Sequence, residues 1–168
     1  MKKIGILSDT HAYWDDRYIT YFTGCDEIWH AGDIGSETVL ERLRDIAPVV
    51  RAVRGNIDGS NLRKDLKDVE IFTTDGVKVL MTHIGGYPGK YAPGIKALLL
   101  EHEPQIFVAG HSHILKVIND PWLHCLHINP GAAGRQGWQV VSTLVLLTID
   151  KGAPVDCQVI ELSRPTFR

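Results

Sequence analysis

Short apolar runs recur along the first half of the chain and alternate with helical patterns. Buried strands are predicted at residues 4–7, 27–31 and 49–53. Helices are predicted between them, the first closed by Gly24 and the second capped by Ser36, at residues 15–22 and 37–46. This β-α-β-α-β order favours a parallel sheet, in which ligands bind at the carboxyl ends of the strands.

The second half is predicted to form hairpins around one further helix and one further buried strand. The three turns expected between apolar runs are Asp75-Gly76, Asn119-Asp120-Pro121 and Lys151-Gly152. They join runs 71–73 and 77–81, 115–118 and 122–128, and 140–149 and 155–162. The helix and the buried strand are expected at 95–101 and 106–109. These elements predict an α/β fold, a four-layer α/β/β/α sandwich of two mixed sheets flanked by helices.

Composition narrows the class of protein. The chain has 168 residues, which predicts a single domain over 1–168, and its 18 basic and 20 acidic side chains give a net charge of -2. That balance argues against a nucleic-acid partner, which would favour a basic surface. Three cysteines without a CxxC pair suit a reducing cytoplasm. The apolar stretch after Lys2-Lys3 is too short for a signal peptide, and no run is long enough for a membrane span.

Side chains that can bind metal ions follow five of the predicted strands. Each stands just past a strand's carboxyl end, and most have Gly, Ser or Thr beside them: Asp9, His11, Asp33, Asn56, His83, His111 and His113. Carboxylate oxygen mixed with imidazole nitrogen suits Mn, Zn or Fe better than calcium. Seven ligands are too many for one tetrahedral ion and suit two ions that share one bridging carboxylate.

The alternating order of the ligands predicts their local geometry. In Asp9-Thr10-His11 and His111-Ser112-His113, an extended segment would place both ligands on one side. His30 lies within a predicted strand, and we expect it to be buried and to orient a ligand carboxylate from behind. The remaining histidines lack the strand-end context and are interpreted as ordinary: His102, His124 and His127.

These motifs resemble a known family. In order, the chain carries Asp9-Thr10-His11, Gly32-Asp33, Gly55-Asn56-Ile57-Asp58, Thr82-His83, Gly110-His111-Ser112-His113 and Asn129-Pro130-Gly131. Together they resemble the calcineurin-like metallophosphoesterases, and in particular their small bacterial and archaeal phosphodiesterase branch. The resemblance implies one metal held by Asp9, His11, Asp33 and His113. It implies a second held by Asp33, Asn56, His83 and His111, with Asp33 bridging.

The resemblance also implies the chemistry. Two divalent ions, with Mn favoured and Mg, Ni, Co, Zn or Fe as alternatives, would deprotonate a bridging water that attacks a small phosphodiester. Asp33, Asn56 and His83 would act in catalysis through the metal-bound hydroxide and phosphate. Many members of the family carry a histidine after the metal-binding Asn as a proton donor, where this chain has Ile57. We therefore expect a preference for good leaving groups.

Rival functions use the same fold. A retromer subunit of eukaryotes shares it and serves as a scaffold that binds protein partners, whereas a phosphomonoesterase or a nuclease would keep the metals. All seven ligands are present, which favours an enzyme. Exposed strands also suit a homodimer or homotetramer. Arg54 and Arg135 could each bind a phosphate or form a structural ion pair. The loop with Tyr87, Lys90 and Tyr91 could form the rim of a substrate site or be a turn-rich connection.

Overall fold

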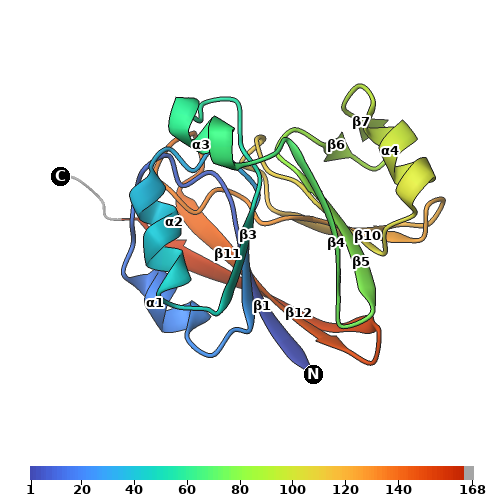
Figure 1. Cartoon of the computed structure of the whole chain (residues 1–168), viewed down its shortest axis with the longest axis horizontal. Helices are drawn as coiled ribbons and strands as arrows, with labels where there is room; N and C mark the ends of the chain where they lie inside the picture. Colours follow the sequence, from blue (N-terminus) through green and yellow to red (C-terminus); the bar gives the residue numbers. More distant parts are fainter. Residues whose placement is uncertain (165–168) are drawn as a thin grey trace.

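Two five-stranded mixed β-sheets pack face to face, and helices cover their outer faces. The structure is a computed structural model that describes residues 1–164. Figure 1 shows α1 and α2 on one side of the two sheets and α4 on the opposite side. The predicted four-layer α/β/β/α arrangement is confirmed by this architecture.

The first sheet has the strand order β12-β11-β1-β2-β3. Its members are β1 (Lys2–Leu7), β2 (Glu27–His30), β3 (Val49–Ala52), β11 (Val141–Asp150) and β12 (Ala153–Ser163). The strands β1, β2 and β3 are parallel, as the alternating pattern predicts, with Ile4 opposite Glu27 and Glu27 opposite Val49. The hairpin of β11 and β12 adds to the other edge of β1 in antiparallel fashion.

The second sheet has the strand order β4-β5-β8-β10-β9. Its members are β4 (Val69–Thr74), β5 (Val77–Thr82), β8 (Ile106–Val108), β9 (Lys116–Asp120) and β10 (Cys125–Asn129). The central strands β5, β8 and β10 are parallel, and the edge strands β4 and β9 pair in antiparallel fashion. Each sheet therefore has three parallel strands, and the loops that follow all six strands lie at the same edge of the sandwich. A two-stranded hairpin, β6 (Gly86–Tyr87) and β7 (Lys90–Tyr91), lies in the loop after β5.

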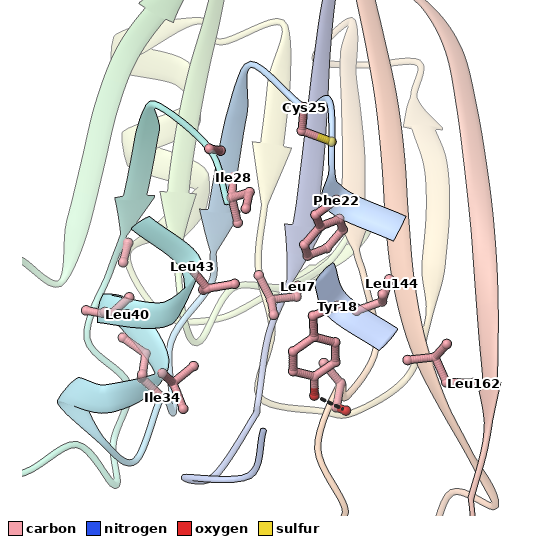
Figure 2. Packing of buried hydrophobic residues seen from close by; sticks show 14 of the residues in the cluster. Leu7, Tyr18, Phe22, Cys25, Ile28, Ile34, Leu40, Leu43, Leu144 and Leu162 are labelled. Atoms are coloured by element: carbon pink, nitrogen blue, oxygen red, sulfur yellow. Dashed lines mark hydrogen bonds between the residues drawn. The ribbon is translucent and has the colours of Figure 1, made fainter. Parts of the chain in front are cut away.

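Two amphipathic helices, α1 (Arg17–Phe22) and α2 (Glu37–Arg44), cover the first sheet. Ser36 caps α2 as predicted, because its hydroxyl accepts a hydrogen bond of 3.2 Å from the backbone N–H of Thr38. Buried side chains of both helices pack on the sheet, and Figure 2 shows Tyr18, Phe22, Leu40 and Leu43 facing Leu7, Ile28 and Leu144. The Tyr18 hydroxyl donates to the carbonyl of Ala133, which ties α1 to the loop after β10.

The main core lies between the two sheets. Its fully buried members alternate along the strands of both sheets, as half-buried β-strands require: Ile4, Ile6, Trp29, Val77, Val79, Met81, Ile106, Val108, Ile128, Val145, Leu147 and Ile149. On the outer face of the second sheet, α4 (Ile95–His102) packs Ile95 and Leu99 against Leu80 and Phe107. Among the described residues, no helix is long and apolar enough to cross a membrane.

Some boundaries differ from the sequence prediction. A helix that the sequence analysis did not predict, α3 (Ser60–Asp65), follows the Asn56 loop, and α2 ends two residues before Ile46. The predicted turn at 119–121 is wrong by several residues, because Asp120 belongs to β9 and the turn covers 121–124. The Asp120 carboxylate accepts hydrogen bonds from the N–H groups of Trp122 and Leu123, so this aspartate initiates the turn rather than standing inside it.

Two isoleucines on the paired strands β9 and β10 test this packing. Ile128 is fully buried between the sheets, whereas Ile118 is 40% exposed. We expect Ile128→Ala to lower the free energy of unfolding by about 2–5 kcal/mol, because it leaves a cavity in the core. Ile118→Ala should cost about 1 kcal/mol or less. Urea denaturation measures both, and equal losses would contradict the assignment of these two faces.

Candidate metal centre

The carboxyl ends of all six parallel strands open onto one edge of the sandwich. Asp9 follows β1, Asp33 follows β2 and Asn56 follows β3 in the first sheet. In the second sheet, His83 directly follows β5, and the loop after β8 carries both His111 and His113. Asn129 ends β10, the sixth of these strands.

Six of the seven predicted ligands form two compact groups. Asp9, His11 and His113 each offer one atom within 4.8 Å of the others, and the same holds for Asp33, His83 and His111. The seventh, Asn56, places its side-chain oxygen 3.1 Å from Nδ1 of His111. The structure therefore brings all seven predicted side chains together, six of them in two groups of three.

Asp33 lies between the two groups. Its Oδ2 atom is 3.1 Å from Nε2 of His83, which belongs to its own group. The same oxygen is 3.6 Å from Nε2 of His11, which belongs to the other group. One carboxylate oxygen thus faces ligand atoms of both groups, which is the position expected of a bridging ligand.

Hydrogen bonds to one oxygen, Oδ2, hold the Asp9 carboxylate in place. Oδ2 accepts hydrogen bonds from the Ser8 hydroxyl at 2.6 Å and from the backbone N–H of His111 at 3.0 Å. The other oxygen, Oδ1, has no hydrogen-bond partner among the described residues although it is buried. It lies 3.1 Å from Nε2 of His113 and 3.7 Å from Nε2 of His11. Gly110 permits this contact, since a Cβ atom there would collide with Ser8 and Asp9.

The Asp33 carboxylate is held in the same way. Its Oδ1 accepts a hydrogen bond of 3.0 Å from the backbone N–H of Ile57, which leaves Oδ2 directed at the histidines. Asp58 fixes the surrounding loops, because one of its oxygens accepts from the N–H of Gly35 and the other from the N–H of Gly55. A Cβ atom at Gly55 would overlap Asp33, so the two loops meet closely only because this residue is glycine.

The orientation of His83 is set by backbone. Its Nδ1 donates to the carbonyl of Ala31 at 2.8 Å, so Nε2 is the ring nitrogen that faces Asp33. Nε2 of His83 and Nε2 of His11 are both buried without a hydrogen-bond partner among the described residues. Buried polar atoms normally have hydrogen-bond partners. A cation bound between these nitrogens and the nearby carboxylate oxygens would give them one. The donor set therefore fits divalent metal ions.

Most of the ligands have strained backbone. Five of the seven adopt positive φ angles: Asp9 at 55°, His11 at 46°, Asp33 at 53°, His111 at 71° and His113 at 63°. The prediction that residues 9–11 and 111–113 are extended is therefore wrong. Both segments turn sharply. Asp9 and His11 still join the same group, whereas His111 and His113 join different groups instead of lying on one side. Strain of this kind is concentrated at functional sites, where the surrounding contacts enforce it.

Charge compensation explains how the acids are tolerated at such burial. Burial alone would raise the pKa of Asp9, but His11 and His113 hold the pKa of this carboxyl far below its ordinary value. Burial opposes ionisation of Asp33 as well, and His83 and the Ile57 N–H still lower its pKa. In return, Asp33 and Asp9 raise the pKa of His83 despite its burial, and Asp9 raises the pKa of His113.

The other histidines separate into distinct roles. His30 is buried, but it orients backbone loops rather than a ligand carboxylate: its Nδ1 accepts from the N–H of Gly32 and its Nε2 lies 3.0 Å from the Thr10 hydroxyl. Thr10 in turn donates to the carbonyl of Ile34. His30 thereby connects the loops that carry Asp9 and Asp33. The three histidines interpreted as ordinary lie outside both groups: His102, His124 and His127.

Four of the five candidate substrate residues have side-chain partners within the protein. Arg54 forms a two-pronged ion pair with Asp68. Arg135 lies over the ring of Tyr13 at 4.3 Å. In the loop after β5, the Tyr87 hydroxyl contacts Ser112 between the two ligand histidines, Tyr91 donates to Asp120, and Lys90 is exposed. Tyr87 is therefore the member of this loop that reaches the site.

Several positioning residues were not singled out from the sequence. Ser8 and Asp58 hold the two ligand carboxylates or their loops, and Asn129 donates to the carbonyl of Gly110 and to Ser112. Asp58 and Asn129 stand inside the motifs Gly55–Asp58 and Asn129–Gly131, so the motifs carried a signal. What a sequence does not show is that these side chains act on backbone groups of a neighbouring loop.

The fold and the donor set together define a metallohydrolase-type α/β protein. The model of the calcineurin-like phosphoesterase superfamily domain matches residues 1–152. A probable metallophosphoesterase of Methanocaldococcus jannaschii is 32% identical over 156 residues, which cover 88% of this chain and 77% of the relative. The chain belongs to the calcineurin-like phosphoesterase superfamily, whose general activity is metal-dependent hydrolysis of phosphoesters.

Solved structures share the fold. Vps29 of Entamoeba histolytica in complex with zinc superposes with a TM-score of 0.73 at 18% identity, covering 95% of this chain and 98% of that one. A structure described as a novel archaeal phosphodiesterase has a TM-score of 0.70 at 23% identity and covers 95% and 99%. These likenesses confirm the arrangement of the two sheets.

His127 provides a test of the burial described above. It is fully buried beside Tyr87 and Phe107, and neither ring nitrogen has a hydrogen-bond partner among the described residues. Burial lowers its pKa to about 4, from 6.5 in the unfolded chain. The unfolded state therefore binds a proton first as the pH falls, so stability is lost between pH 6.5 and about 4.

We expect His127→Leu to remove up to about 3 kcal/mol of this acid-induced loss. Urea denaturation of both proteins at several pH values between 7 and 4 measures the difference. His124→Leu, at an exposed position on the preceding turn, is the control and should leave the pH dependence unchanged. The same slope for His127→Leu and the unsubstituted protein would show that the imidazole is not buried in its neutral form.

Proposed function

We propose that this protein is a dinuclear metal-dependent phosphodiesterase that hydrolyses a small phosphodiester. The observation that carries the proposal is a set of buried atoms without a hydrogen-bond partner among the described residues: Oδ1 of Asp9, Nε2 of His11 and Nε2 of His83. The two histidine nitrogens lie within 3.9 Å of Oδ1 of Asp9 and within 3.6 Å of Oδ2 of Asp33. A protein that used this edge only as a scaffold would gain nothing from keeping strained ligands and unpaired polar atoms there.

In this proposal, each ion has a defined set of ligands. One ion would be held by Asp9, His11, Asp33 and His113. The other would be held by Asp33, Asn56, His83 and His111. Mn²⁺ suits the mixture of carboxylate, amide and imidazole donors, and Mg, Ni, Co, Zn and Fe are alternatives. When bound, the two cations supply positive charge for the phosphoryl transition state and lower the pKa of a water molecule.

The protein's own residues fix the geometry. Ser8 and the His111 N–H prevent Asp9 from rotating, and the Ile57 N–H does the same for Asp33. The Ala31 carbonyl fixes the tautomer of His83. These contacts are made before any substrate binds, so the ligands need not be reordered during the reaction.

Residue 57 limits the choice of leaving group, because its side chain cannot protonate one. Ile57 is 46% exposed beside Asn56, and its hydrocarbon side chain has no proton to donate. Esters whose leaving group departs without protonation are therefore favoured. The likeness to a protein described as an archaeal phosphodiesterase supports a phosphodiester as the class of substrate.

Hydrolysis of bis-p-nitrophenyl phosphate tests the proposal. We expect activity with Mn²⁺, its loss after chelation and its recovery when Mn²⁺ is returned. Asp33→Ala should lower kcat/KM by about 10³-fold or more, since it removes a ligand common to both ions. The control is Asp156→Ala, at an exposed position on β12, which should behave like the unsubstituted protein.

Activity that survives chelation, or that survives Asp33→Ala, would contradict a metal mechanism. Binding of Mn²⁺ without cleavage of any phosphoester would instead favour the scaffold function. Cleavage of p-nitrophenyl phosphate in preference to the diester would favour a phosphomonoesterase.

The residue at position 57 gives a second prediction. Across a series of aryl phosphodiesters, log kcat should fall steeply as the pKa of the leaving phenol rises, because no side chain at position 57 protonates it. Ile57→His should flatten this dependence and raise the rate of the poorest leaving groups by about 10- to 100-fold. A dependence that is already flat in the unsubstituted protein would mean that another group supplies the proton.

A further inference from the structure

A cleft of about 300 Å³ opens directly beside the second group of ligands. Asn56 and His83 contribute to its lining, so a substituent of a phosphoester bound at the metal centre can extend into the cleft. The rest of the lining comes from the loop after β3, from α3 and the loop that follows it, and from the end of β5 and the loop beyond: Arg54, Gly55, Arg63, Asp68, Thr82 and Ile84. The volume is at the small end of ligand pockets and suits a group of one or two rings.

One wall of the cleft is a fixed guanidinium plane. Each of the three nitrogens of Arg54 donates one hydrogen bond: Nε and Nη2 to the two oxygens of Asp68, at 2.7 and 3.0 Å, and Nη1 to the carbonyl of Arg63, at 2.7 Å. These bonds hold the group in place within its plane and neutralise its charge. They use three of the five N–H groups and fix the orientation of the flat face, which the group can offer to a ligand.

Other arginines of the described chain show what occupies such a face. Arg42, Arg51 and Arg135 lie over the rings of Trp14, Phe72 and Tyr13, at 4.6, 4.2 and 4.3 Å. Among the described residues, no aromatic ring lies over Arg54. Stacking on an aromatic ring is favourable for a guanidinium, and the cleft beside Arg54 has room for a ring supplied by a ligand.

The apolar side chains at this end of the site favour the same kind of ligand. Ile84 directly follows His83, lines the cleft and is 44% exposed. Ile57 directly follows Asn56 and is 46% exposed. An apolar group of a ligand that covered these two side chains would remove their aliphatic surface from water, which is favourable.

We propose that this cleft is a subsite for a planar aromatic substituent of the phosphodiester, which would stack on Arg54 and contact Ile84. The inference rests on the proposed phosphodiesterase function and adds the class of substrate, an ester that carries an aryl group or a nucleobase. Arg54 is a specificity residue in this account and takes no part in the chemical step.

Binding of two diesters with the same charge tests the subsite without requiring turnover. Isothermal titration calorimetry of the Mn²⁺-loaded protein compares diphenyl phosphate with dimethyl phosphate. The subsite should make diphenyl phosphate bind about tenfold more tightly. Arg54→Lys keeps the positive charge but loses the plane, and Ile84→Thr keeps the branched shape but loses apolar contact. Each should reduce the preference severalfold, whereas Ile118→Thr, at a similarly exposed isoleucine of β9, should not.

The outcomes separate the possibilities. The methyl ester of thymidine 5′-monophosphate is the third probe. If it binds more tightly than diphenyl phosphate, the subsite is assigned to a nucleobase. If it binds more weakly, the subsite is assigned to an aryl group. Equal affinities for all three esters, no binding of any of them, or a preference unchanged in both Arg54→Lys and Ile84→Thr would overturn the proposal. Hydrolysis of bis-p-nitrophenyl phosphate in parallel shows whether the proposed function survives when the subsite does not.

Discussion

The burial of two carboxylates beside four imidazoles is the constraint on which the rest of the structure depends. Asp9 is fully buried and Asp33 nearly so, and a buried charge is costly unless partners surround it. Each acid has one oxygen tied to the neighbouring loop and one directed at histidine nitrogens. The fold supplies this by ending six parallel strands, three from each sheet, at the same edge.

Local strain is the cost of that convergence. Positive φ angles at Asp9, Asp33 and His111 turn the chain abruptly at the strand ends, whereas an extended backbone there would continue in the direction of the strand. The turns persist because His30 and Asp58 hold neighbouring loops together. They accept hydrogen bonds from the backbone N–H groups of Gly32, Gly35 and Gly55, and His30 also bonds the Thr10 hydroxyl. Stability and function therefore share the same contacts, so a substitution at Asp58 would disturb both.

Much of the fold and of the site was predictable from the sequence, for a physical reason. Strands alternate with helices in the first half, and strand ends carry ligands, so Asp9, Asp33 and His83 could be assigned to one edge before any geometry was known. The six-residue helix α3 was missed because its sequence has only one buried apolar side chain, Leu62. The turned backbone at residues 111–113 was missed because it depends on contacts with other loops, such as those of Asn129.

The central claim is that one bridging carboxylate joins two cation sites, and counting bound ions tests it most directly. Equilibrium dialysis against Mn²⁺, with metal analysis of the protein, should give two ions per chain. His113→Ala should leave one tightly bound ion, whereas Asp33→Ala should weaken both, with circular dichroism confirming that each variant is folded. A stoichiometry of one or none, or two ions retained by Asp33→Ala at unchanged affinity, would contradict the account.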